Sequence, residues 1–186
     1  MTVTIDSCEE IFKGKELQLN HERVTLGNGV RTEYDILVFP GASAIVPLPD
    51  RETVLLIRQY RHAIGGDIWE IPAGTFNTGE KPLECAMREL PEETGYRATT
   101  WHDLGKIIPI PGHSNKRVHL FLAMDLEKTE QNLDADEILH VEKVRFDDAI
   151  TMILDGRIMD AKSICALFMA QMFFASHSKR NGCGRV

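Results

Sequence analysis

Alternation of apolar and polar positions predicts a small antiparallel sheet at the start of the chain. Residues 16–26 alternate loosely and lead into a turn that contains Asn28 and Gly29. Both of these residues accept the positive φ angles of a tight hairpin. Residues 34–39 then form the return strand, so residues 1–39 are predicted to be one antiparallel sheet.

The rest of the chain predicts an α/β domain, with a mixed sheet and helices on both of its sides. A helix begins near Pro82, since proline fits a first helical turn, and ends at Gly95, a residue favoured at helix C-termini. Asp147 is expected to cap a short helix that Gly156 ends. Methionines and phenylalanines of the final helix are interpreted as core packing. The predicted elements are strands 42–47, 53–59, 98–108, 117–125 and 138–146, a loop over 61–79, and helices 82–95, 147–154 and 160–174.

The length of 186 residues suits one domain with a smaller N-terminal appendage. Residues 1–39 are expected to be this appendage, a β arm. Residues 40–177 are expected to be the main domain, and the polar, glycine-containing residues 178–186 a mobile tail.

Composition excludes several classes of protein. A net charge of −7 argues against a nucleic-acid binder, which needs a basic face, although metal ions can still mediate contact with an anionic nucleotide. No stretch reaches the ~18 apolar residues of a membrane span, and residues 1–10 lack the pattern of a signal peptide. The cysteines form no CxxC pair, which favours free thiols in a reducing, cytoplasmic location. They are Cys8, Cys85, Cys165 and Cys183.

Three glutamates share one edge of the helix predicted from Pro82. Glu89, Glu92 and Glu93 are three and four residues apart, so their like charges repel one another. Arg88 points about one-quarter turn away and is not expected to neutralise them alone. A hard divalent cation would do so; a solvated acidic helix face is the alternative. Pro91 removes one backbone hydrogen bond and should kink the helix.

A longer pattern surrounds these glutamates and resembles the Nudix box. It reads Gly74-x5-Glu80-x7-Arg88-Glu89-Leu90-x-Glu92-Glu93-x-Gly95-Tyr96. The resemblance implies the Nudix fold, an α/β/α sandwich with a mixed sheet, for residues 40–177. Tyr96 departs mildly from the family pattern, which usually has a small aliphatic residue at this position.

The same resemblance implies a divalent-metal site, with Mg²⁺ as the expected ion and Mn²⁺ as the alternative. Arg88 and Glu80 are expected to brace the loop and helix by ion pairing rather than to take part in the chemistry. The implied metal ligands are Glu89, Glu92, Glu93 and the carbonyl oxygen of Ala73.

Segments on both sides of the box resemble the ADP-ribose pyrophosphatase branch of the family. They are residues 40–47, 58–61, 69–74, 109–122 and 156–158. The resemblance implies hydrolysis of ADP-ribose, a nucleoside diphosphate sugar, to AMP and ribose 5-phosphate. It also implies a homodimer that exchanges N-terminal strands, and the predicted hairpin fits such an arm.

Several side chains take substrate-binding roles under this resemblance. Arg61 would hold a substrate phosphate, since a guanidinium fork suits phosphate oxygens; a surface ion pair is the alternative. Glu70 would help to position the substrate or to form the dimer. A purely structural role for Glu70 is the equal alternative. Tyr34 or Phe39 would stack on adenine, although packing within the sheet explains both residues as well.

The family places a catalytic carboxylate in a loop well after the box, where this chain has residues 134–137. Glu137 is the first choice for the general base that removes a proton from the attacking water, and Asp136 is the second. A solvated acidic loop is the alternative. Lys116 departs from the branch, which often has acidic residues after the serine at this position, and this change could alter sugar preference.

Two other functions remain open at this stage. Hydrolysis of GDP-mannose or a UDP-sugar would use the same metal chemistry with different loops. A Nudix-fold sensor would bind a nucleotide without cutting it, but degenerate boxes mark such proteins and this box keeps all its carboxylates. Metal-dependent release of AMP separates enzyme from sensor.

Overall fold

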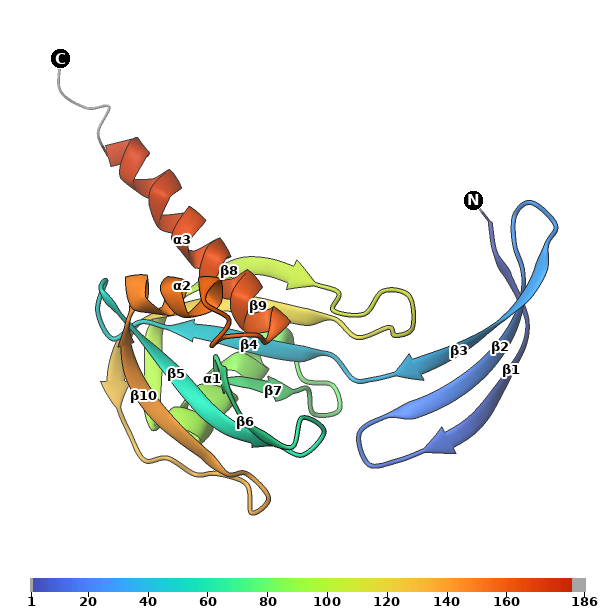
Figure 1. Ribbon diagram of the computed structural model, residues 1–186, viewed down its shortest axis with the longest axis horizontal. Helices are drawn as coiled ribbons and strands as arrows, with labels where there is room; N and C mark the ends of the chain where they lie inside the picture. The colour runs from blue at the N-terminus through green and yellow to red at the C-terminus, as the bar shows by residue number, and fades with distance from the viewer. Residues whose placement is uncertain (1, 182–186) are drawn as a thin grey trace. The chain divides into compact units, whose positions relative to one another are not determined.

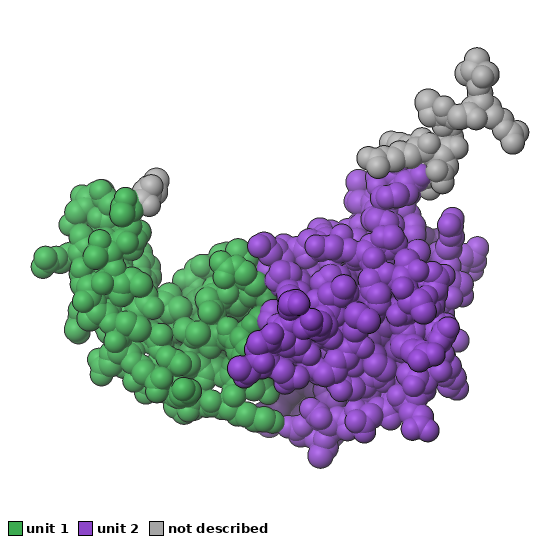
Figure 2. Space-filling view, turned by 180° about the vertical axis from the view of Figure 1, so that it is seen from behind, with its two compact units in different colours: residues 1–41, 108–117 green, residues 42–107, 118–186 purple. Residues whose placement is uncertain are grey.

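The computed structural model describes residues 2–181, with side chains through His177. The chain forms two compact units, coloured separately in Figure 2. Unit 1 comprises Met1–Gly41 and Ile108–Arg117, and unit 2 comprises Ala42–Ile107 and Val118–Val186. The segment Ile108–Arg117 belongs to unit 1 because its backbone pairs with the end of the N-terminal sheet; Leu37 N donates to His113 O at 2.8 Å.

Unit 1 contains the predicted antiparallel sheet. Its strands β1 (Thr4–Lys13), β2 (Gln18–Thr25) and β3 (Arg31–Val38) lie in the order β1-β2-β3. Gly29 takes a φ of 84° in the turn between β2 and β3, and its N–H donates to Leu26 O. This confirms the hairpin. The entire length of β1 is exposed, and it was not resolved as a separate strand from the sequence.

Unit 2 combines two sheets and three helices (Figure 1). One sheet is mixed and has the order β7-β4-β9-β8, with β4 and β9 parallel; the other has the antiparallel order β10-β5-β6. The elements are β4 (Ala42–Pro47), β5 (Thr53–Arg61), β6 (Gly66–Glu70), β7 (Ala73–Thr75), α1 (Pro82–Thr94), β8 (Tyr96–Ile107), β9 (Val118–Lys128), β10 (Leu139–Arg145), α2 (Phe146–Leu154) and α3 (Ala161–Asn181).

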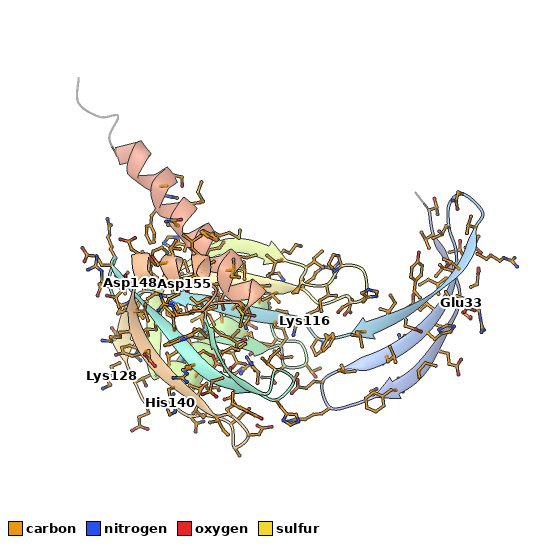
Figure 3. All side chains as sticks on the ribbon, in the orientation of Figure 1. Glu33, Lys116, Lys128, His140, Asp148 and Asp155 are labelled. Carbon is orange, nitrogen blue, oxygen red and sulfur yellow. The ribbon has the colours of Figure 1, made fainter. Side chains whose placement is uncertain are left out.

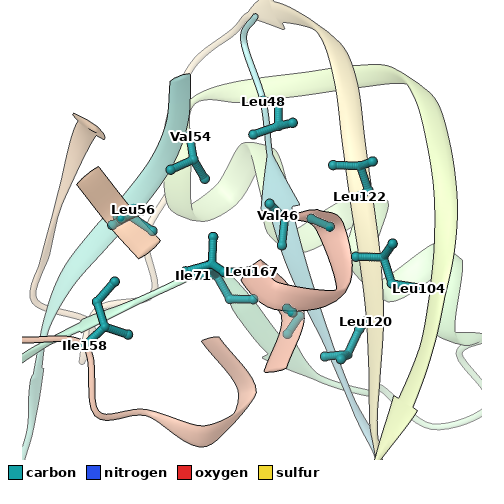
Figure 4. Close-up of a cluster of buried hydrophobic side chains, with 14 of the residues drawn as sticks. Val46, Leu48, Val54, Leu56, Ile71, Leu104, Leu120, Leu122, Ile158 and Leu167 are labelled. Atoms are coloured by element: carbon teal, nitrogen blue, oxygen red, sulfur yellow. The ribbon is translucent and has the colours of Figure 1, made fainter. Parts of the chain in front are cut away.

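The mixed sheet is buried on both faces, because its central strands alternate their side chains between two cores. On β4, Val46 points into the core shared with α2 and α3 (Figure 4), whereas Ile45 points into the core shared with α1. Leu120 and Phe121 divide in the same way on β9. These layers are the predicted α/β/α sandwich with a mixed sheet.

Some predicted boundaries need correction. The predicted loop 61–79 contains β6 and β7, whose backbones are fixed by pairing with distant strands. Helix α2 is preceded by Arg145 and has no side-chain cap, so Asp147 does not cap it. Helix α3 continues to Asn181, beyond the predicted end at residue 174. Of the predicted mobile tail, residues 182–186 lie outside the described part.

The described cysteines are free thiols, as the sequence predicts. They are Cys8, Cys85 and Cys165, and Cys183 lies outside the described residues. Among residues 2–181, no helix is long and apolar enough to cross a membrane.

Candidate active site

Helix α1 places the three glutamates of the box at different depths. Its Ala86 and Leu90 pack against the sheet, which turns the adjacent edge toward β7. Glu93 is only 1% exposed, and one of its oxygens accepts the N–H of Ala73 at 2.9 Å. Burial, reinforced by the nearby Glu89 carboxylate, raises the pKa of Glu93 well above its ordinary value.

Glu89 packs directly over Gly74. A Cβ atom on Gly74 would lie 1.7 Å from the Glu89 carboxyl carbon, so any other residue at this position would force the Glu89 carboxylate to move. Burial also raises the pKa of Glu89, against the opposing effect of its hydrogen bond with Arg88. The box glycine and the box helix therefore form a single packed unit.

Arg88 neutralises more of the glutamate edge than its position on the helix suggests. Its Nη1 donates to Glu89 at 2.6 Å and to Glu92 at 2.9 Å. The prediction that Arg88 points away from these carboxylates is wrong, because its long side chain reaches Glu92 one turn along the helix and Glu89 beside it. Arg88 also forms two hydrogen bonds with Glu80, which confirms the predicted brace.

Loss of the brace should destabilise the fold. Hydrogen bonds from Arg88 lower the pKa of Glu80 to about 2. Its stabilising contribution is therefore fully present above the ordinary pKa of 4.5 and is lost as pH falls through about 2. Glu80→Gln should lower the free energy of unfolding by about 2 kcal/mol at pH 7, measured by urea denaturation. The difference should shrink toward pH 2; a constant difference would contradict this account.

The loop after β9 is attached to the C-terminal end of α1. Thr129 N donates to Gly95 O at 2.8 Å, and Gln131 Nε2 donates to Glu93 O at 2.6 Å. Gly95 takes a φ of 69°, the left-handed conformation that favours glycine at a helix end. These bonds occupy carbonyl groups that a helix terminus leaves without partners.

Glu137 follows in this loop. Its negative charge helps to raise the pKa of both Glu89 and Glu93. One Glu137 oxygen accepts the backbone N–H of Asp134 at 3.1 Å, which fixes the loop locally. Asp136 is exposed on the same loop.

A second charged cluster joins two of the predicted substrate residues. Glu70 is buried at the end of β6, and one of its oxygens receives Nε and Nη2 of Arg61 at 2.8 and 2.6 Å. Its other oxygen receives Nζ of Lys162 at 2.8 Å, and Asp160 accepts a second bond from the same amine. Sequence reasoning missed Lys162 and Asp160, although a lysine at the start of an apolar final helix was an available signal.

The remaining predicted substrate residues lie in unit 1. Tyr34 is on β3, opposite Glu22 of β2, with 42% of its surface exposed. Phe39 follows β3, and the ammonium of Lys116 lies 5.1 Å from the centre of its ring. Both aromatic residues belong to unit 1, whereas the box belongs to unit 2, and their adenine-binding role stays a prediction.

The donor atoms of the glutamate edge suit a hard divalent cation in their chemistry, since all of them are oxygen atoms. Glu93 supplies a deeply buried carboxylate, and Glu89 lies beside it. Within the described residues, however, no three His, Cys, Asp or Glu side chains already form a metal site. Arg88 binds both Glu89 and Glu92 in this structure.

Comparison with known protein families identifies the class of this protein. The family model described as "NUDIX domain" matches residues 39–167, which include the box and both charged clusters. The chain belongs to this family. The crystal structure of an ADP compounds hydrolase has a similar fold, with a TM-score of 0.84, 25% sequence identity, and coverage of 100% of this chain and 98% of that one.

Two relatives are similar to this chain over most of its length. The ADP-ribose pyrophosphatase of Bacillus subtilis (strain 168) is 36% identical over 166 residues, covering 88% of this chain and 90% of that protein. The GDP-mannose pyrophosphatase of Yersinia enterocolitica is 35% identical over 141 residues, covering 71% and 73%. By family and fold, this chain is a Nudix pyrophosphohydrolase.

Proposed function

We propose that this protein hydrolyses the diphosphate bridge of ADP-ribose to AMP and ribose 5-phosphate. The observation that carries the proposal is the packed glutamate edge of α1, where the buried Glu93 accepts the N–H of Ala73 and Glu89 packs over Gly74. The similarity to an ADP-ribose pyrophosphatase over 88% of the chain supports the choice of substrate.

The proposed roles follow from the surroundings of each side chain. Glu137 acts as the general base and Asp136 is the alternative, because both belong to a loop fixed to the end of α1. Arg61 binds a phosphate with the part of its fork that Glu70 does not use. Mg²⁺, or Mn²⁺ in its place, supplies charge neutralisation of the diphosphate when it is bound. Its proposed ligands are Glu89, Glu92, Glu93 and the carbonyl of Ala73.

Substrate preference is tested by comparing kcat/KM for ADP-ribose, GDP-mannose, UDP-glucose and a dinucleotide, each with Mg²⁺ and with a chelator. The expected result is Mg²⁺-dependent turnover with ADP-ribose preferred. Preference for GDP-mannose would favour the second candidate, which the similarity to a GDP-mannose pyrophosphatase supports. Binding without turnover across the panel would instead indicate a nucleotide sensor.

We further propose that the protein is a cytoplasmic homodimer and that unit 1 forms the interface. Its sheet leaves several large apolar side chains exposed, which is unusual for a surface that stays in water. They include Ile5, Ile11, Phe12 and Tyr34. Light scattering should give twice the 21.0 kDa chain mass, and Phe12→Asp should shift the protein toward monomer. A monomeric wild-type protein would contradict this part of the proposal.

A further inference from the structure

The first turn of α3 carries a partly buried charge that none of the proposed roles uses. The Lys162 side chain is 15% exposed, and its Nζ donates to Glu70 at 2.8 Å and to Asp160 at 3.0 Å. A lysine is almost never fully buried unless it is paired, and here two carboxylates hold its ammonium group. Lys162 and Glu70 are 92 residues apart in the chain, so the pair joins α3 to the end of β6.

The same turn of α3 also fixes the backbone next to Glu70. Ser163 Oγ accepts the buried N–H of Ile71 at 2.9 Å and itself donates to Asp160. Asp160 accepts the backbone N–H of Ser163 at 2.9 Å, which is the usual cap of a helix N-terminus. Both the carboxylate and the backbone at the end of β6 are therefore held by α3.

These contacts determine how Arg61 can point. Lys162 occupies one oxygen of Glu70, so the guanidinium of Arg61 bonds only to the other oxygen, through two of its nitrogens. An arginine has five N–H donors in a fixed fork, and 38% of this side chain remains exposed. Part of the fork is thus left for another anion.

We propose that Lys162 is a positioning residue, which holds one oxygen of Glu70 so that Arg61 presents its remaining donors to a substrate phosphate. This inference rests on the proposed function, in which Arg61 binds that phosphate. Without the ammonium, Arg61 would be the one charged partner of Glu70 among the described residues, and Glu70 would draw the guanidinium toward both of its oxygens. Fewer donors would then reach the substrate.

The kinetic test compares Lys162→Met, Lys162→Arg and the wild type with ADP-ribose and Mg²⁺. Lys162→Met should raise KM about tenfold, equivalent to about 1.4 kcal/mol of lost binding, and change kcat less than about threefold. Lys162→Arg keeps the charge and should recover most of the affinity. Lys128, at the end of β9 and labelled in Figure 3, is exposed, and Lys128→Met serves as the matched control with unchanged KM.

A double-variant cycle shows whether Lys162 acts through Arg61. Arg61→Met should raise KM by itself, and adding Lys162→Met should raise it little further, because the two residues belong to one network. Independent, multiplicative effects of the two substitutions on KM would overturn the proposal.

A measurement without substrate separates this inference from the proposed function. The Nε–H of Arg61, assigned by its loss in Arg61→Lys, should give a ¹⁵N NMR signal that exchanges with water more slowly in Lys162→Met than in the wild type, because the guanidinium then bonds to both oxygens of Glu70. If Lys162→Met fails to fold, Lys162→Gln, whose neutral amide holds the Glu70 oxygen more weakly, should change the exchange rate in the same direction by a smaller amount. An unchanged Arg61 signal would overturn the positioning role, whereas absence of hydrolysis by the wild type would overturn the proposed function alone.

Discussion

Gly74→Ala is expected to lower kcat/KM about 10²-fold or more while the protein remains folded. The added Cβ would lie 1.7 Å from the Glu89 carboxyl carbon and 1.8 Å from one of its oxygens. Glu89 cannot move aside freely, because Arg88 holds its carboxylate at 2.6 Å. A displacement of about 1 Å at a catalytic centre can cost about 10²-fold in rate.

Gly66→Ala is the matched control for this substitution. Gly66 lies in β6 of the same unit, and a Cβ atom there would meet nothing within 4 Å. Both rates and urea denaturation curves should be measured, since overpacking at Gly74 should also cost about 1–3 kcal/mol of stability. Equal activity in the two alanine variants would show that the Gly74–Glu89 contact does not position a catalytic group.

Glu93→Gln is expected to remove most turnover without damage to the fold. Replacing a residue that only orients a metal ligand typically lowers metal affinity or activity about 10–100-fold. Loss of a direct ligand should lower activity by more than that. The glutamine keeps an oxygen that can accept the N–H of Ala73, as Glu93 does at 2.9 Å. Full activity in this variant would contradict the ligand assignment.

Stability provides a second test of Glu93. Its pKa is raised in the folded protein, so its contribution to stability is fully present below the ordinary value of 4.5 and is lost as pH rises through the folded-state pKa. In the absence of metal, Glu93→Gln should therefore be at least as stable as the wild type at pH 8. Urea denaturation with a chelator at pH 4.5 and pH 8 measures this. A variant less stable at pH 8 would indicate that the carboxylate stabilises the fold.

Local signals made much of the fold predictable. Helix α1 begins at Pro82 and ends before Gly95. Proline is favoured in the first turn of a helix, and glycine is favoured just after its last turn. Strand β4 occupies the predicted residues 42–47, because an apolar run between turn residues identifies a buried strand. Strands β6 and β7 were missed, since pairing with distant strands stabilises them within a segment rich in glycine.

The candidate site was also predictable only in part. The glutamate edge follows from helical spacing, and the bond from Arg88 to Glu92 could have been expected from their separation of four residues. The contact of Lys162 with Glu70 joins residues 92 positions apart, and no local motif predicts it. Only the tertiary fold, which brings the first turn of α3 to the end of β6, joins those two charges.

The most direct test of the proposed function is ³¹P NMR of ADP-ribose incubated with the protein, with Mg²⁺ and with a chelator. The diphosphate signals should disappear and two phosphomonoester signals, from AMP and ribose 5-phosphate, should replace them only when Mg²⁺ is present. Diphosphate signals that persist with Mg²⁺, whether ADP-ribose stays intact or is cut to ADP and ribose, would contradict the proposal.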